Sequence, residues 1–462
     1  MHNKKIYLLL TMAIGVFSGC ISTDTGTLSE SIREERLKKV ELRNNANFNE
    51  AENRDGKNEL PVISGDLSLE DAIKLSMANN LALKAAYISR DAVDGAILEA
   101  YSGFLPNVGL SAQAMSDIPS KNDSDSYSLG VNITQPLWRG GGISAALHYA
   151  KIYAYSTDAS IRKKVQETIY ETTLKYMDVL LAQHLVDVYD DAVKVAERML
   201  QTTESKLKSG TSRSYDVLRA EVEVAKTKSD LIKEQNNLQT SKVALLQMLG
   251  VSQNSNVALS GELVYSPTEY NIEAESAKAL IEKPDVLIAE ANVRMAKEQI
   301  NIVKSAYQPS ADLFLNGAYE NTSKSDDSWD DKWTVGAKLT FSLFDGFARR
   351  GRVIQATSKY NEAQAQLADV EERTHVNVVN SVLQLRYADE LFNSQKKNVL
   401  IATEAMRMIE AGSNLGRNTP LEVLDARASL TEAMGAYYRA VYVHNAANLS
   451  VQNATGTLTP PQ

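Results

Sequence analysis

The sequence predicts a mainly helical chain with a small amount of β structure and two similar halves. Three observations predict this fold class. The stretches 143–209 and 352–411 contain neither glycine nor proline, which is typical of very long helices. Two shorter regions, about 106–138 and 309–344, alternate apolar and polar residues with the period of a β-strand. Matching motifs recur 203 to 206 residues apart.

The composition limits the classes of function. The chain has 462 residues, a net charge of −9 and an aromatic content of only 7%. A net negative charge argues against a nucleic-acid partner. The five histidines are scattered, and none lies in a metal-binding or catalytic motif. We therefore expect no enzyme activity, no cofactor and no metal site.

Residues 1–19 predict a secretory signal peptide. A basic start, MHNKK, precedes the 12-residue apolar run IYLLLTMAIGVF, which is too short to span a bilayer. Ser18 and Gly19 then precede Cys20, the only cysteine. This junction resembles the lipobox of bacterial lipoproteins, which implies that Cys20 is lipidated (palmitate being the expected acyl group) and begins the mature chain. The alternative is an ordinary signal peptide with an incidental cysteine.

The residues after Cys20 predict location and a linker. Ile21 follows the cysteine where an aspartate would favour retention in the inner membrane, so the resemblance implies the outer membrane of a Gram-negative bacterium. The stretch 20–65 is polar, charged and without periodicity. We interpret it as the lipid anchor and a linker.

The helical segments are placed by caps and periodicity. A helix is predicted to begin near Ser68, with Glu70 and Asp71 in its first turn, and to run to about Gly103. The stretch 143–209 would form a rod of about 100 Å. Apolar residues recur every seven positions along later segments, which indicates packing like that of a coiled coil. These positions are Leu231, Leu238 and Leu245, and Leu385, Phe392, Val399 and Met406.

The alternating segments predict four strands. They cover about 106–116, 126–138, 309–319 and 332–344. Their length suits tilted strands that cross a bilayer, and the tryptophans Trp138, Trp329 and Trp333 lie in or beside them. We predict Trp138 and Trp333 as members of a membrane girdle. Four strands are too few to close a barrel, and lipid offers no hydrogen bonds to an open edge, so several copies of the chain must share one barrel.

The two halves, 66–260 and 261–462, repeat the order helix, hairpin, long helix, turn, helix. GTSRSYDVLRA at 210–220 corresponds to GRNTPLEVLDA at 416–426. Phe104 corresponds to Tyr307 at an offset of 203, and positions after the hairpins correspond at 206. The change falls in the hairpin loops, where insertions are tolerated. We interpret the pattern as an internal duplication.

This order of elements resembles the TolC family of outer-membrane efflux proteins, in particular its lipoprotein branch, similar to OprM, over residues 66–455. The resemblance implies a homotrimer whose protomers each give four strands to a 12-stranded outer-membrane barrel. It also implies a helical tunnel through the periplasm. The turns at 208–220 and 414–426 would lie at its periplasmic end, where an adaptor docks and connects the duct to an inner-membrane pump.

The resemblance also implies a gate. Glu422 and Asp425 match an acidic pair that projects into the lumen, so three protomers would form a ring of carboxylates favouring cations. The alternative is a pair of solvated acids near a helix N-terminus. The candidate docking or latch residues of the two turns are Gly210, Tyr215, Asp216, Arg219, Gly416, Arg417 and Asn418. Arg417 and Asn418 stand where the family would have a single basic residue.

Other functions are open at this stage. The same duct would serve a type I protein-secretion pump, and a structural trimeric coiled-coil lipoprotein is a further alternative. A stand-alone porin would have many strands and short periplasmic turns instead of helices about 60 residues long. Gly140–Gly142 follows a strand and precedes a helix, as in phosphate-binding loops, but a turn at the junction of strand and helix explains it.

Overall fold

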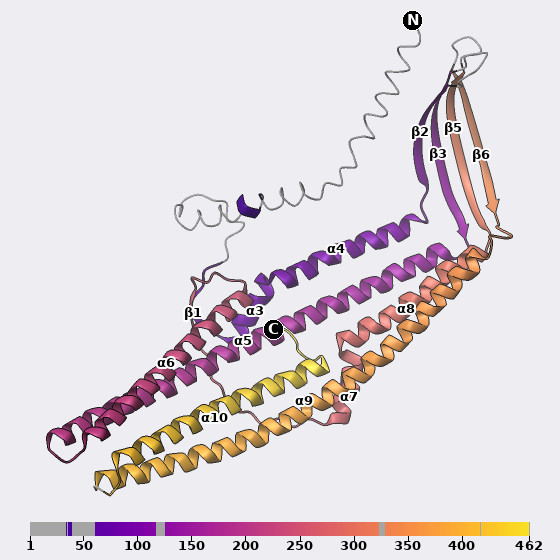
Figure 1. Cartoon of the computed structure of the whole chain (residues 1–462). Helices are drawn as coiled ribbons and strands as arrows, with labels where there is room; N and C mark the ends of the chain where they lie inside the picture. Colours follow the sequence, from indigo (N-terminus) through magenta and orange to yellow (C-terminus); the bar gives the residue numbers. More distant parts are fainter. Residues whose placement is uncertain are drawn as a thin grey trace. The chain divides into compact units, whose positions relative to one another are not determined.

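The computed structural model describes residues 34, 36–38, 61–116, 125–322, 329–415 and 417–461 (Figure 1). The chain divides into two units, 1–59 and 60–462, and the second unit is the subject below. The predicted signal peptide, Cys20 and Gly416 lie outside the described residues, as do residues 117–124 and 323–328 between the strands of the two predicted hairpins.

The helices form matched pairs, one member from each half. α5 (Gly142–Lys208) and α9 (Ala348–Asn414) have 67 residues each, and α6 (Ser214–Leu249) and α10 (Pro420–Thr455) have 36 each. The shorter pairs are α3 (Leu69–Asn79) with α7 (Ile272–Glu282), and α4 (Leu81–Ser102) with α8 (Pro284–Lys304), which runs into the 3-10 turn η1 (Ser305–Tyr307). α5 packs along α6, and α9 along α10 (Figure 1).

The first predicted helix is in fact two helices. Ser68 caps α3 as expected, because its Oγ accepts the N–H of Asp71 at 3.1 Å. The expectation of one helix to Gly103 was wrong, since the backbone is extended at Asn80. The Asn80 side chain accepts the N–H groups of Ala82 and Leu83 and so starts α4.

Four strands form one antiparallel sheet in the order β2-β3-β5-β6. Their bounds are β2 (Asn107–Ser116), β3 (Asp125–Arg139), β5 (Ser310–Thr322) and β6 (Asp330–Thr340). The predicted hairpins are β2–β3 and β5–β6, and β3 also pairs with β5. In this sheet β2 and β6 are the edge strands.

The register separates the sheet into an apolar and a polar face. One row across the four strands consists of Leu110, Val131, Gly317 and Trp333. These four positions share one face of the sheet. Large apolar side chains on this face are exposed to a third or more of their surface: Val108, Leu110, Tyr127, Leu129, Trp138, Leu313, Tyr319, Trp333, Val335 and Leu339. The opposite face carries mainly polar residues, among them Asn132, Thr134, Asn316, Thr334 and Lys338. The alternation read from the sequence is therefore present in three dimensions.

The last strand ends earlier than predicted. β6 stops at Thr340, which pairs with Ser310, whereas the sequence suggested residue 344. The next partner on β5 would be Pro309, which has no N–H to donate to the ladder. Beyond Thr340 the guanidinium of Arg349 holds the carbonyl of Leu343 at 3.2 Å and closes the turn into α9.

Four of the seven predicted heptad positions are buried in the helix seams, and Leu231, Leu238 and Val399 are partly buried. Leu385, Phe392 and Met406 of α9 and Leu245 of α6 are 2–5% exposed, and Leu238 is partly buried beside Leu245. One element was not expected: a parallel pair of β1 (Ser64–Leu67) and β4 (Asn256–Leu259). The buried Tyr176 of α5 joins them, because its hydroxyl donates to Leu67 O and accepts from Gly261 N–H.

Candidate functional site

The candidate site consists of two helix tips, defined as residues 208–220 and 414–426. At the first tip five residues separate the end of α5 from the start of α6. Gly210 takes a left-handed φ of 75°, which a glycine allows without strain. The Asp216 carboxylate accepts the Ser212 hydroxyl and the Arg213 N–H, both at 3.1 Å. Asp216 therefore stabilises the start of α6.

The second tip uses the same device. Thr419 Oγ1 accepts the N–H of Glu422 at 3.3 Å, and the Glu422 carboxylate accepts the N–H of Thr419 at 2.8 Å. This reciprocal capping box, with Pro420 at the first helical position, sets where α10 begins. Glu422 consequently has a structural contact in its own turn, which the reading of the sequence did not include.

The other predicted tip residues are dispersed. Asp425 is exposed one turn further along α10, and Tyr215 and Arg219 are exposed on α6. Asn418 is folded against its own tip, where its amide donates to the carbonyl of Ile409 at 3.4 Å. The backbone N–H of Arg417 donates to the carbonyl of Gly412 at 2.8 Å and its side chain is exposed. Among the described residues, no predicted latch residue of the first tip contacts one of the second by hydrogen bond or ion pair.

A different pair connects the two helical hairpins. Arg427, on α10, lies 3.1 Å from the carboxylate of Asp191 on α5. The Arg427 side chain is 17% exposed, and within the described part of the chain its Nε has no hydrogen-bond partner. A cavity of about 350 Å³ adjoins it, with walls from α5, α6 and α10. No sequence pattern predicts this contact, because it depends on how two helical hairpins far apart in the chain lie against each other.

The two predicted girdle tryptophans lie on the apolar face of the sheet, in different rows. Trp138 pairs with Ala311, and Trp333 pairs with Gly317 further along the same strand. A Cβ at Gly317 would come within 2.6 Å of the Trp333 ring, so the glycine makes room for the indole. Within the described residues no helix is long and apolar enough to cross a membrane.

A family model for the outer membrane efflux protein matches this chain twice, at residues 72–251 and 276–457. The chain belongs to this family. This chain is 25% identical to the outer membrane protein TolC of Vibrio cholerae over 412 residues, covering 85% of this chain and 91% of the relative. It is also 25% identical to the cobalt-zinc-cadmium resistance protein CzcC of Cupriavidus metallidurans, covering 84% and 90%.

The fold of this efflux protein has close counterparts among solved structures. A crystal structure of CusC superposes with a TM-score of 0.74 at 16% identity, covering 88% of this chain and 99% of CusC. The family and the fold together place the chain among outer-membrane channels that pass substrates out of the cell. This confirms the predicted family, the mainly helical fold with a few strands, and the location in the outer membrane.

Proposed function

We propose that this efflux protein is the passive exit duct of a tripartite pump, assembled as a homotrimer with a periplasmic adaptor and an inner-membrane transporter. The observation that carries the proposal is the sheet. Its apolar face is exposed along all four strands, and its edge strands β2 and β6 each have one neighbour. In lipid such edges need partners, and pairing β6 of one protomer with β2 of the next closes a 12-stranded barrel.

The tips are the proposed periplasmic mouth and the surface for adaptor docking. Three copies place Glu422 and Asp425 in one ring, where six carboxylates favour cations. Glu422 has two roles in this proposal, since its carboxylate both caps α10 and contributes charge to the ring. The pair Arg427–Asp191 holds α10 against α5, so we propose that opening the mouth separates these residues.

The test is single-channel conductance of the mature protein in a planar bilayer. The informative variant is Glu422→Gln with Asp425→Asn, because glutamine keeps an oxygen to accept the Thr419 N–H while the charge is lost. We expect a cation-selective wild-type channel and a variant with reduced selectivity. Glu371→Gln, an exposed acid in the middle of α9, is the matched control and should behave like wild type.

Two outcomes would revise the proposal in different ways. A channel with unchanged selectivity in the double variant would keep the duct and remove the gate assignment. A well-folded protein that forms no trimer and does not insert into the bilayer would favour the coiled-coil spacer. Co-purification of a type I secretion adaptor would assign the same duct to protein export, and the mass of the partner would distinguish it from an efflux adaptor.

A further inference from the structure

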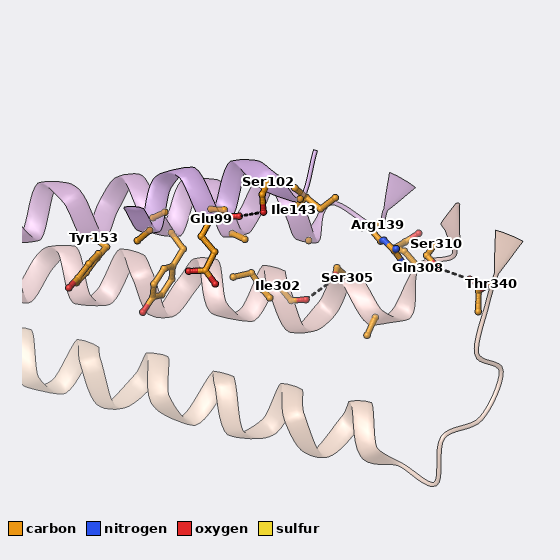
Figure 2. Close-up of a pocket in the computed structure, with 18 of the residues that line it drawn as sticks. Glu99, Ser102, Arg139, Ile143, Tyr153, Ile302, Ser305, Gln308, Ser310 and Thr340 are labelled. Carbon is orange, nitrogen blue, oxygen red and sulfur yellow. Dashed lines mark hydrogen bonds between the residues drawn. The ribbon is translucent and has the colours of Figure 1, made fainter. Parts of the chain in front are cut away.

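A large cavity lies where the helices meet the sheet. Its volume is about 800 Å³, and its walls come from α4, α5, α8 and the ends of strands nearest these helices (Figure 2). This volume is typical of pockets for small organic molecules. None of its lining residues belongs to either tip, so the cavity is separate from the proposed gate.

The cavity opens on the polar side of the sheet. Arg139, Ser310 and Thr340 line it, and the strand register places these three residues in one row on the polar face. The exposed tryptophans lie on the opposite face. In the proposed duct the polar face borders the lumen, so the cavity is a recess in the lumen wall below the barrel. The inference therefore rests on the proposed function.

The walls of the recess are apolar and partly aromatic. Tyr149 and Tyr153, four residues apart on α5, are 36% and 43% exposed, so their rings are only partly covered by protein. Ile143 and Ile302 add aliphatic surface from α5 and α8. Small residues leave the space open: Ala96, Ala100, Ala146, Ala150 and Ala306.

The recess carries one uncompensated charge. Among the described residues that line it, Glu99 and Arg139 are the charged ones. Arg139 lies 2.7 Å from the carboxylate of Asp312, whereas the Glu99 carboxylate has no ion pair within the described residues. Figure 2 shows the Glu99 side chain extending from α4 toward the helix that carries Ile302. A carboxylate beside exposed tyrosine rings is the chemistry that binds organic cations.

The corresponding positions of the second half lack this chemistry. At the offsets of the repeat, Glu99 corresponds to Ile302, Tyr149 to Gln355 and Tyr153 to Lys359. The second half thus has neither the acid nor the aromatic pair. Each protomer therefore has one such recess, and Ile302 contributes to it from the other half.

We propose that this recess is a transit site for lipophilic organic cations, with Glu99 as the charge partner and Tyr149 and Tyr153 as the aromatic wall. A cation that has passed the acidic mouth loses part of its hydration shell and contacts the tyrosine rings and the Glu99 carboxylate instead. It then leaves through the barrel. Neutral molecules of the same size gain only the apolar contact. The site gives the lumen a preference among small cargoes without closing it to others.

The test is calorimetric binding of tetraphenylphosphonium to the detergent-solubilised trimer, with triphenylphosphine oxide as a neutral aromatic comparison. Glu99→Gln is expected to weaken binding of the cation about tenfold and to leave the neutral compound unchanged. Tyr153→Leu should weaken it by a smaller factor, and Tyr153→Phe should retain it because the ring face remains. Lys359→Ala, at the corresponding place in the second half, is the control and should have no effect.

Separate readouts distinguish this site from the duct itself. In a planar bilayer the cation should produce transient blocks of the wild-type current that Glu99→Gln shortens. The cation site would be overturned if both compounds bound equally, or if Glu99→Gln did not weaken binding of the cation. An intact conductance in that case would leave the duct in place. Absence of conductance with cation binding still dependent on Glu99 would overturn the duct and support the site.

Discussion

The two halves of this efflux protein share backbone geometry more closely than side-chain chemistry. Their helices have the same lengths in three of four pairs, 67, 36 and 11 residues. The helices α6 and α10 both end at glycines with left-handed φ, Gly250 and Gly456, 206 residues apart. Along the recess, by contrast, Glu99 and Tyr153 of the first half correspond to Ile302 and Lys359 of the second.

This comparison separates two kinds of position. At two pairs of positions with a left-handed backbone the halves keep glycine, Gly140 with Gly346 and Gly250 with Gly456, whereas Gly141 corresponds to Phe347. Along the recess, where side chains face the proposed lumen, the halves differ. A duplicated scaffold thus sets the lengths and turns, and the chemistry of the duct comes from positions at which the halves have diverged. Substitutions that exchange residues between the halves test this separation.

The largest effect is expected at Gly250 and Gly456, the glycines that end α6 and α10. A Cβ at Gly250 would lie 2.8 Å from the carbonyl oxygen of Asn79, and one at Gly456 would lie 2.9 Å from Cα of Lys283. Alanine at either position should cost about 2–3 kcal/mol, because left-handed strain and a backbone collision add. Gly210→Ala has the same strain and open space around it, so it should cost about 1 kcal/mol.

Thermal unfolding of the detergent-solubilised protein, followed by circular dichroism, measures these differences. Equal losses at Gly250, Gly456 and Gly210 would show that the collisions are relieved by small movements of the backbone. The predicted difference between Gly250 and Gly456, which have close backbone neighbours, and Gly210, which has none, would then be wrong.

A smaller effect is expected where the halves use different caps. Asn80 and Lys283 have nearly the same backbone conformation before α4 and α8, but only Asn80 caps its helix with its side chain. Asn80→Ala should cost about 1 kcal/mol, and Lys283→Asn should gain a similar amount. A Lys283→Asn variant no more stable than Lys283→Ala would show that the second half cannot use the cap.

The Lys283 substitution also has a pH signature. Burial lowers the pKa of Lys283, so the folded state bears a cost while the ammonium is charged. The cost is fully present below the folded-state pKa and disappears as the pH rises past the unfolded value of about 10.4. The advantage of Lys283→Asn should therefore shrink on going from pH 8 to pH 10.5 in the same unfolding measurement.

The smallest effect concerns the turn before each long helix. Gly141 precedes α5 with a φ of 79°, and Phe347 precedes α9 with a φ of 67°, the one such conformation outside glycine among the described residues. Phe347→Gly removes left-handed strain but adds flexibility to the unfolded chain, so we expect a gain of about 0.5 kcal/mol.

Gly141→Ala is the converse substitution. A Cβ there has its nearest neighbour at 4.0 Å, so the loss should be conformational only, at about 1 kcal/mol. A loss of stability in Phe347→Gly would show that the contacts of the phenylalanine, among them its edge-on packing against Phe344, outweigh its strain.

The sequence predicted those parts of the fold that depend on local periodicity. The long helices, the seam at Leu385 and Met406 and the alternation around Val131 all follow from spacing alone. The break at Asn80 was missed because no glycine or proline marks it; the amide of a single side chain makes the cap. The β1–β4 pair was missed because its strands are short and their paired positions, such as Ser64 and Asn256, are 192 residues apart.

The candidate site was predictable in position and less so in contacts. The repeated motif located both tips, and the structure gives Asp216 and Glu422 equivalent roles as caps. The gate and girdle assignments remain predictions. The contact of Arg427 with Asp191 requires knowledge of how one helical hairpin lies on the other, which heptad spacing does not supply.

The spacing of Trp138 and Trp333 on the sheet has a consequence for sorting among membranes. Their partners on β5, Ala311 and Gly317, are six residues apart, which corresponds to about 20 Å along the strand. An average bilayer has a hydrocarbon core of about 30 Å, and the bacterial outer membrane is thinner than average. With both tryptophans in the predicted girdle, hydrophobic mismatch would penalise this sheet in a thick bilayer and favour the thin one.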